Sequence, residues 1–105
     1  MRNEYFLKIE EDVIAHVYFR TEKRRVTEFV AKLMVLCDNT WHEVIRYDSG
    51  HGCPHKDILY INGDVTRKIW YDFLTNDQAL TMAIMDIKDN YLFYKERFLK
   101  WLNEQ

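Results

Sequence analysis

The chain has 105 residues, of which 48% are hydrophobic and 15% aromatic. This length fits a single domain over residues 1–105, and this apolar content supports a packed core and excludes an intrinsically disordered chain. The formal net charge of −2 excludes an obligatory electrostatic binder of duplex nucleic acid, because such domains are strongly basic.

The sequence also predicts where the protein works. The longest apolar run, residues 33–37, is far too short to span a bilayer. The N-terminal segment carries acidic side chains where a secretory signal peptide needs an apolar stretch, so we expect a cytoplasmic protein without membrane contact. Cys37 and Cys53 are expected near opposite ends of one strand, which is too far apart for a disulfide, so both should be free thiols.

The chain begins with two β-like segments, residues 4–9 and 12–20, around an acidic turn. A cluster of basic side chains follows the second segment. We interpret this cluster as a solvated turn between strands, because short basic runs are weak evidence for nucleic-acid contact. Its members are Arg20, Lys23, Arg24 and Arg25.

The clearest strand pattern covers residues 25–37, where apolar side chains recur at every second position. One face of this strand should meet the core, while the other face is mixed and only partly covered. The expected core face consists of Thr27, Phe29, Ala31, Leu33, Val35 and Cys37.

Two hairpins complete the predicted sheet. A turn at residues 38–39 leads into a strand over residues 41–47, and Asn62-Gly63 predicts a tight hairpin between residues 58–61 and 66–71. The strand after the first turn is expected to carry Trp41, Glu43, Ile45 and Tyr47 on one side.

The pattern changes to a helical period near residue 75. Thr75 and Gln78 have the spacing of a capping box, and apolar side chains then recur at three- and four-residue steps. We therefore predict an α+β fold, in which one long C-terminal helix over residues 75–102 packs on an antiparallel β-meander of five or six strands over residues 4–71.

The length of this helix suggests a contact surface. It should measure roughly 40 Å, whereas a strand of ordinary length covers about 20 Å. We expect the helix to overhang the sheet and expose an apolar patch, which favours a homodimer or a protein partner at the C-terminal helix. Alternatively, the N-terminal segment folds back over the patch. The patch consists of Tyr94, Phe98, Trp101 and Leu102.

The segment from Arg46 to Asp57 is the candidate functional site, because a long polar loop on a rigid scaffold is a common place for function. Two of the four histidines of the chain lie here. The chain has no phosphate-binding glycine loop, C-x-x-C or H-E-x-x-H motif, and we expect no cofactor. The candidate residues are Arg46, Asp48, His51, Cys53, His55, Lys56 and Asp57.

Three interpretations of this segment remain open. In the first, His51 and His55 act as acid and base in RNA cleavage, because imidazoles exchange protons near neutral pH. Arg46 or Lys56 would then bind phosphate, with the aspartates orienting the imidazoles. The second is a metal site formed by His51, Cys53 and His55 with Asp48 or Asp57. In the third, these side chains only stabilise the loop, and the protein is a non-enzymatic interaction module.

The segment also carries a family resemblance. Arg46-Tyr47-Asp48, followed by His51 and by residues 55–57, resembles the R-[YW]-D-x-x-H-G-x-x-H-x-D motif of small uncharacterised prokaryotic proteins. It resembles more distantly the arginine-aromatic-aspartate-histidine segment of TumE-like toxins from toxin–antitoxin pairs, in which several histidines follow the aspartate. The resemblance implies a prokaryotic protein, and our leading hypothesis is a toxin-like RNA-cleaving enzyme that uses Arg46, Asp48, His51, His55 and Asp57.

Overall fold

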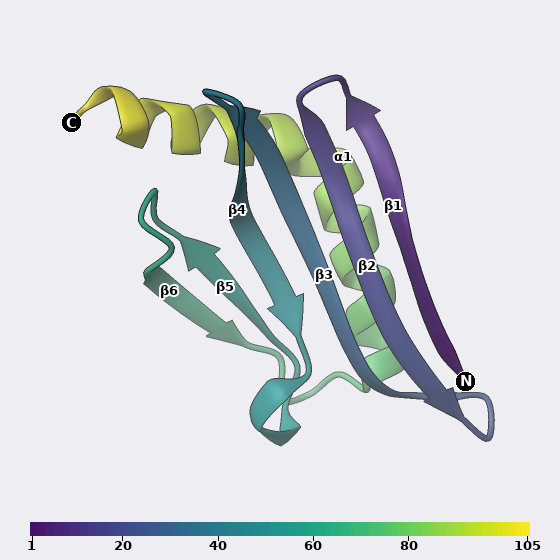
Figure 1. Ribbon diagram of the computed structural model, residues 1–105. Helices are drawn as coiled ribbons and strands as arrows, with labels where there is room; N and C mark the ends of the chain where they lie inside the picture. Colours follow the sequence, from purple (N-terminus) through teal and green to yellow (C-terminus); the bar gives the residue numbers. More distant parts are fainter.

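A computed structural model describes residues 1–105 and confirms the predicted α+β fold (Figure 1). A six-stranded antiparallel sheet has its strands in chain order, and one long helix crosses one of its faces. We call the other face, turned away from the helix, the open face. The elements are β1 (Arg2–Glu10), β2 (Val13–Glu22), β3 (Arg25–Cys37), β4 (Thr40–Asp48), β5 (His55–Leu59), β6 (Val65–Trp70) and α1 (Asn76–Asn103).

The turns between strands follow the local sequence signals. Asp38 and Asn39 adopt positive φ angles of 52° and 62° in the β3–β4 turn, a conformation that these residue types tolerate. Gly63 has a φ of 89° in the β5–β6 hairpin. The basic cluster surrounds the β2–β3 turn, where Lys23 and Arg24 have positive φ and are exposed.

The core forms between β3 and the helix, as the period-two pattern predicted. Phe29, Ala31, Leu33 and Val35 are all buried on the helix side of β3. Burial of such side chains stabilises the fold by about 1.5–3 kcal/mol for each large residue. The helix contributes Ala79, Leu80, Ala83, Ile87, Tyr94 and Phe98 to this core.

The predicted facing of β4 was wrong in one respect. The register between β3 and β4 shifts between Leu33 and Met34, so that Val44 forms a bulge. A bulge adds one residue and moves the residues beyond it to the other face. Ile45 and Tyr47 therefore face the helix, whereas Trp41 and Glu43 lie on the open face with Met34 and its neighbours.

The predicted loop was also too long. Its last three residues, 55–57, belong to β5, and the register pairs Asp48 with His55 and Arg46 with Asp57. Only residues 49–54 connect the strands, and they include a short 3₁₀ turn at Gly50–Gly52. The functional candidates are therefore held mainly by two paired strands.

The helix begins with the predicted capping box, in which Thr75 Oγ1 accepts from Gln78 N–H and Gln78 Oε1 accepts from Thr75 N–H. Trp101 and Leu102 of the expected exposed patch are half-buried, and its other two members, Tyr94 and Phe98, are buried, at 6% and 0% exposed. The sheet covers them instead of the N-terminal segment: the Phe98 ring lies 5.4 Å from that of His42. The sequence of α1 lacks the apolar run needed to cross a bilayer.

A polar network is enclosed between the sheet and the helix. Asp86 on α1 accepts hydrogen bonds from the hydroxyls of Tyr47 and Tyr94, and Lys56 Nζ lies 3.2 Å from Asp86 Oδ2. Burial alone would raise the pKa of Asp86, but the hydrogen bonds from Tyr47, Tyr94 and Asn90 and the charge of Lys56 together lower it. Burial lowers the pKa of Lys56, and the Asp86 carboxylate offsets this only in part.

This network generates a stability prediction. Asp86→Asn should lower the free energy of unfolding by about 2–3 kcal/mol at neutral pH, because it leaves the buried Lys56 ammonium without a counter-charge. Chemical denaturation followed by tryptophan fluorescence measures this. Asp89→Asn, at an exposed position on the same helix, should change stability little and is the matched control.

The effect should also depend on pH in one direction. Because the folded pKa of Asp86 lies below its usual 3.8, its stabilising contribution is complete above that pH. It is lost as the pH falls through the folded pKa. The difference between wild type and Asp86→Asn should therefore shrink in acid, and a difference that stays constant down to the acid transition would contradict this assignment.

Candidate functional site

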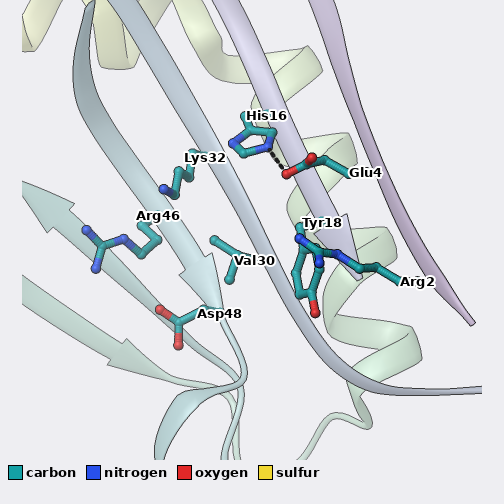
Figure 2. A pocket seen from close by; sticks show the side chains of 8 residues that line it. All are labelled: Arg2, Glu4, His16, Tyr18, Val30, Lys32, Arg46 and Asp48. Atoms are coloured by element: carbon teal, nitrogen blue, oxygen red, sulfur yellow. Dashed lines mark hydrogen bonds and ion pairs between the residues drawn. The ribbon is translucent and has the colours of Figure 1, made fainter. Parts of the chain in front are cut away.

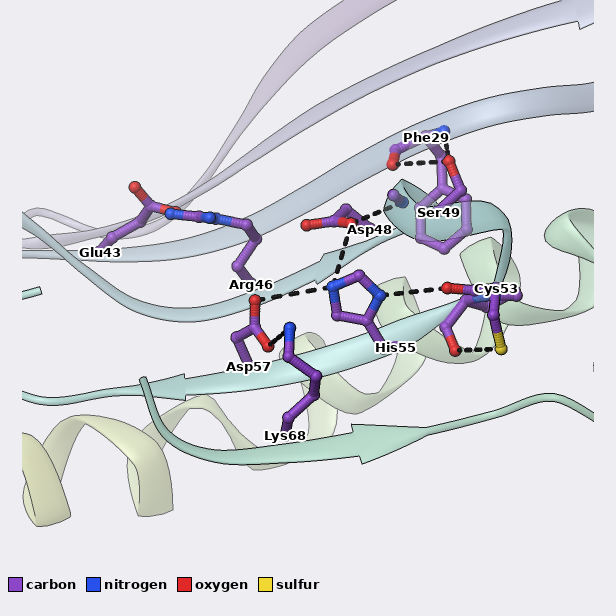
Figure 3. Close-up of polar contacts among 11 residues, drawn as sticks. Phe29, Glu43, Arg46, Asp48, Ser49, Cys53, His55, Asp57 and Lys68 are labelled. Carbon is purple, nitrogen blue, oxygen red and sulfur yellow. Dashed lines mark hydrogen bonds and ion pairs between the residues drawn. The ribbon is translucent and has the colours of Figure 1, made fainter. Parts of the chain in front are cut away.

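The candidate site lies on the open face, where β4 and β5 run side by side (Figure 3). Alternate residues of β5 point to opposite faces of a sheet, so His55 and Asp57 share the open face with Arg46 and Asp48 of β4. The structure therefore brings these four predicted residues together. Glu43 and Lys68 extend the polar contacts on either side (Figure 3).

The imidazole of His55 is fixed at both nitrogens. Nδ1 lies 3.1 Å from the carbonyl oxygen of Cys53, which can only accept a hydrogen bond, so Nδ1 carries a proton. Nε2 lies 3.1 Å from Asp48 Oδ1 and 3.6 Å from Asp57 Oδ2. The ring is only 2% exposed and packs against the ring of Trp70 at 5.0 Å.

This arrangement brings three electron-rich atoms together. With Nδ1 protonated, a neutral His55 would direct the lone pair of Nε2 at two carboxylates. Such an arrangement is unfavourable in a buried site unless Nε2 carries a proton or all three atoms bind a metal ion. The donor atoms of Asp48, His55 and Asp57 all lie within 4.8 Å of one another.

Positive side chains flank both carboxylates. Lys68 Nζ on β6 lies 2.8 Å from Asp57 Oδ1, in an ion pair whose geometry is not that of a hydrogen bond. Arg46 donates to Glu43 Oε1 at 2.6 Å, and this hydrogen bond, with further attraction from Asp48 and Asp57, raises its pKa. The guanidinium therefore stays charged beside the cluster.

A depression of about 540 Å³ continues from Arg46 and Asp48 across β3, β2 and β1 (Figure 2). Three cationic side chains, Arg2, Lys32 and Arg46, line it. His16 on its floor bonds Glu4 at 2.9 Å, and the guanidinium of Arg2 lies 5.0 Å from the Tyr18 ring. Two carboxylates, Glu4 and Asp48, line the depression as well, so it combines side chains of both charges with the aromatic surface of Tyr18.

The other predicted residues lie apart from this cluster. His51 is exposed in the 3₁₀ turn, with its ring 6.1 Å from that of His55. Lys56 points to the opposite face of the sheet, where it joins the Asp86 network. Cys53 contributes its carbonyl to His55, while its thiol contacts the Pro54 carbonyl, and both cysteines are unpaired. Of the predicted metal ligands, His55, Asp48 and Asp57 belong to the converging set, whereas His51 and Cys53 do not.

Sequence reasoning missed two residues of the site, Lys68 and Glu43. The sequence feature that could have identified Lys68 is the hairpin turn at Asn62-Gly63, because a two-residue turn there pairs position 57 with position 68. The structure has this pair. Glu43 could not be found in the same way, because the bulge at Val44 changes its face.

Gly50 fits closely against the site. Its N–H donates to Asp48 Oδ1 at 2.7 Å, and a Cβ at this position would lie 2.9 Å from the same oxygen and 3.8 Å from His55 Cε1. A side chain there would therefore displace the Asp48 carboxylate from His55. This steric limit explains why the residue after Ser49 is a glycine.

We expect Gly50→Ala to lower the free energy of unfolding by about 1–2 kcal/mol, the range for weakening a hydrogen bond to a charged group. A double-mutant cycle isolates the cause, since Asp48→Ala removes the oxygen that the new Cβ would approach. In the Asp48→Ala background, the added effect of Gly50→Ala should largely disappear. An equal loss in both backgrounds would show that the glycine serves the turn and not the carboxylate.

Sequence comparison places this site within a family. No curated protein and no solved structure matches the chain. Residues 1–104 match the family described as Domain of unknown function (DUF7718), which covers all six strands and the helix. The chain therefore belongs to the DUF7718 family.

Proposed function

We propose that Asp48, His55 and Asp57 bind a divalent transition-metal ion, and that the protein uses this ion to bind and cleave RNA. The observation that carries the proposal is the convergence of His55 Nε2 and two carboxylates, with Nδ1 already engaged by a backbone carbonyl. Metal-binding histidines commonly donate their second N–H to such a carbonyl, which fixes the ring for ligation.

The distances agree with metal ligation. Tetrahedral ions with bonds of about 2.1 Å hold their ligand atoms roughly 3.4 Å apart. Nε2 of His55 lies 3.1 Å and 3.6 Å from the two carboxylate oxygens. One imidazole and two carboxylates are ligands suited to Zn²⁺ or Mn²⁺, and three protein ligands leave positions for water or substrate.

The surrounding charges favour a phosphate-bearing ligand. A divalent ion would neutralise Asp48 and Asp57, and the positive charge of Lys68 would then remain unbalanced beside it. The depression beside the site adds the cations Arg2, Lys32 and Arg46, together with the carboxylate of Glu4, along the open face. Cations and bound metals stabilise the charge that develops on a phosphate during transfer.

RNA is the proposed substrate because its ribose 2′-hydroxyl supplies the nucleophile. The 2′-hydroxyl gives its proton to a general base and its oxygen attacks the adjacent phosphorus, which forms a 2′,3′-cyclic phosphate and releases the 5′-oxygen of the next nucleotide, and this oxygen takes a proton from water or from the protonated base. His51 is the exposed imidazole beside the cluster and is the candidate for this proton exchange, while His55 is buried and positions the ion. Tyr18 in the depression and Trp70 beside His55 offer stacking surfaces for bases.

Metal binding is the first test. Titration calorimetry with Zn²⁺ and Mn²⁺ should show one site on the wild type, with at least tenfold weaker binding to Asp48→Asn, Asp57→Asn and His55→Gln. His51→Ala and Cys53→Ser should bind as wild type does. Equal binding by all variants, or none by the wild type, would mean that a proton and not a metal occupies the site.

RNA cleavage is the second test. We expect the metal-loaded protein to cut single-stranded RNA, to lose this activity in EDTA and to regain it when the metal is restored. His51→Ala should lower the rate by about 10²–10⁴-fold without changing metal affinity, as expected for loss of proton transfer. Cleavage that persists in EDTA would favour the two-histidine mechanism.

A protein that binds metal but cuts no RNA would be left with a binding role, and the non-enzymatic interaction module would then be favoured.

The relation to TumE-like toxins is tested by a separate measurement. Growth arrest on expression should depend on Asp48 and His51 if the protein acts as such a toxin, and should be absent from both the Asp48→Asn and the His51→Ala variants.

A further inference from the structure

Strand β1 is a free edge of the sheet, because it pairs only with β2 (Figure 1). Met1 and Thr21 exchange both backbone hydrogen bonds, at 2.7 Å and 2.8 Å, and the register then runs without a shift from Arg2 to Lys8. Since antiparallel pairs alternate, residues 2, 4, 6 and 8 direct their N–H and C=O groups away from β2. These groups form an unused hydrogen-bonding ladder.

The side chains along this edge are complementary to themselves. Glu4, Phe6 and Lys8 lie on the open face, and Glu4 and Lys8 stand two residues before and after Phe6. Phe6 is 62% exposed, and the side chains of Glu4 and Lys8 are 47% and 64% exposed. Turning the segment end to end about Phe6 therefore puts Lys8 where Glu4 was, so a positive charge takes the place of a negative one.

We propose that two copies of the chain form a dimer by antiparallel pairing of β1 with β1, with the two-fold axis at Phe6. Glu4 then lies opposite Lys8 of the partner subunit, and the two Phe6 side chains meet at the axis. Phe6 and its partner form a hydrogen-bonded pair, so the outward groups of residues 4, 6 and 8 are all satisfied. The two sheets join into one continuous sheet.

The opposite face of β1 supports the same register. Tyr5, which is 36% exposed, lies opposite Leu7 of the partner subunit, so an aromatic and an aliphatic side chain bury one another. The pairing ends at the bulge between Lys8 and Glu10, beyond which Glu10 turns to Lys95 on the helix at 3.5 Å. The shared ladder is therefore short, and we expect a dimer that dissociates on dilution.

The charges determine the register and do little for affinity. Glu4 already bonds His16 at 2.9 Å and Lys8 bonds Glu11 at 2.8 Å within one chain, so the dimer contacts replace surface contacts that both side chains already make. Such exposed pairs contribute little energy. Backbone hydrogen bonds and burial of Phe6 and Tyr5 supply the attraction, while like charges oppose shifted registers.

The opposite edge of the sheet is unsuited to the same contact. A two-fold axis at the centre of β6 places either Arg67 or Lys68 opposite the same residue of the partner subunit, so two cations would meet. Pairing of β1 with β6 of another copy is head-to-tail and tends to form open arrays rather than a closed dimer. A second copy at β1 is therefore the occupant that the sequence favours.

The dimer would enlarge the surface used by the proposed function without depending on it. A two-fold axis perpendicular to the sheet keeps both open faces on the same side and both helices on the other. Arg2 and Glu4 line the depression next to β1, so the two depressions would adjoin across the axis.

Charge reversal tests the contact through sedimentation velocity over a range of concentrations. Wild type should show a monomer–dimer equilibrium, and Glu4→Lys or Lys8→Glu alone should weaken it about tenfold or more, because each places like charges together twice. The double variant Glu4→Lys/Lys8→Glu should restore it. Arg67→Glu on β6 should leave it unchanged. A wild type that is monomeric throughout, or single variants that dimerise as wild type does, would overturn the proposal.

Cysteine cross-linking tests the register directly. In a Cys37→Ser/Cys53→Ser background, Phe6→Cys should form a disulfide-linked dimer on mild oxidation, because hydrogen-bonded partners have Cα atoms about 5.5 Å apart. Lys8→Cys should not, since its symmetry mate lies four residues away along the strand. Equal cross-linking at both positions would indicate random collision, and no cross-linking at position 6 would exclude this register.

Discussion

The short ladder between β4 and β5 is the constraint on which the rest of the structure depends. Its four pairs join residues 45–48 to residues 55–58. Because side chains alternate across a sheet, two of these pairs bring Arg46, Asp48, His55 and Asp57 to the open face. The pair between Tyr47 and Lys56 faces the helix. Two polar networks therefore lie on opposite faces of the same short stretch of paired strands.

This arrangement explains how much of the site the sequence contains. The residue types were visible as a polar segment, and the period-two rule applied to positions 55 and 57 would have placed them on one face. The segment was interpreted as a loop because two glycines, the only proline and polar side chains interrupt the apolar strand pattern there. Tertiary partners override that local signal: Lys68 and Asp48 pair the two open-face side chains, and Asp86 pairs Lys56.

The fold was more predictable than the site for a physical reason. The apolar side chains at every second position from Phe29 to Val35, the Asn62-Gly63 turn and the Thr75 cap are local signals that need no knowledge of distant residues. The bulge at Val44 and the covering of Phe98 by His42 depend on how separate elements meet. Helix length alone therefore predicted that Phe98 would be exposed, whereas β4 of the long β3–β4 hairpin packs against it.

The buried network and the candidate site are mechanically linked through β5. Lys56 lies between His55 and Asp57 in the chain, and its ammonium is held at 3.2 Å by Asp86 and at 2.6 Å by the Tyr94 hydroxyl. This anchor limits sliding of β5, and a slip of one residue would exchange its two faces. With β5 held in this register, the carboxylates of Asp48 and Asp57 stay close to Nε2 of His55, and neither needs a further buried contact to hold it there. A site on the open face thus takes its rigidity from contacts made on the opposite side of the same strand.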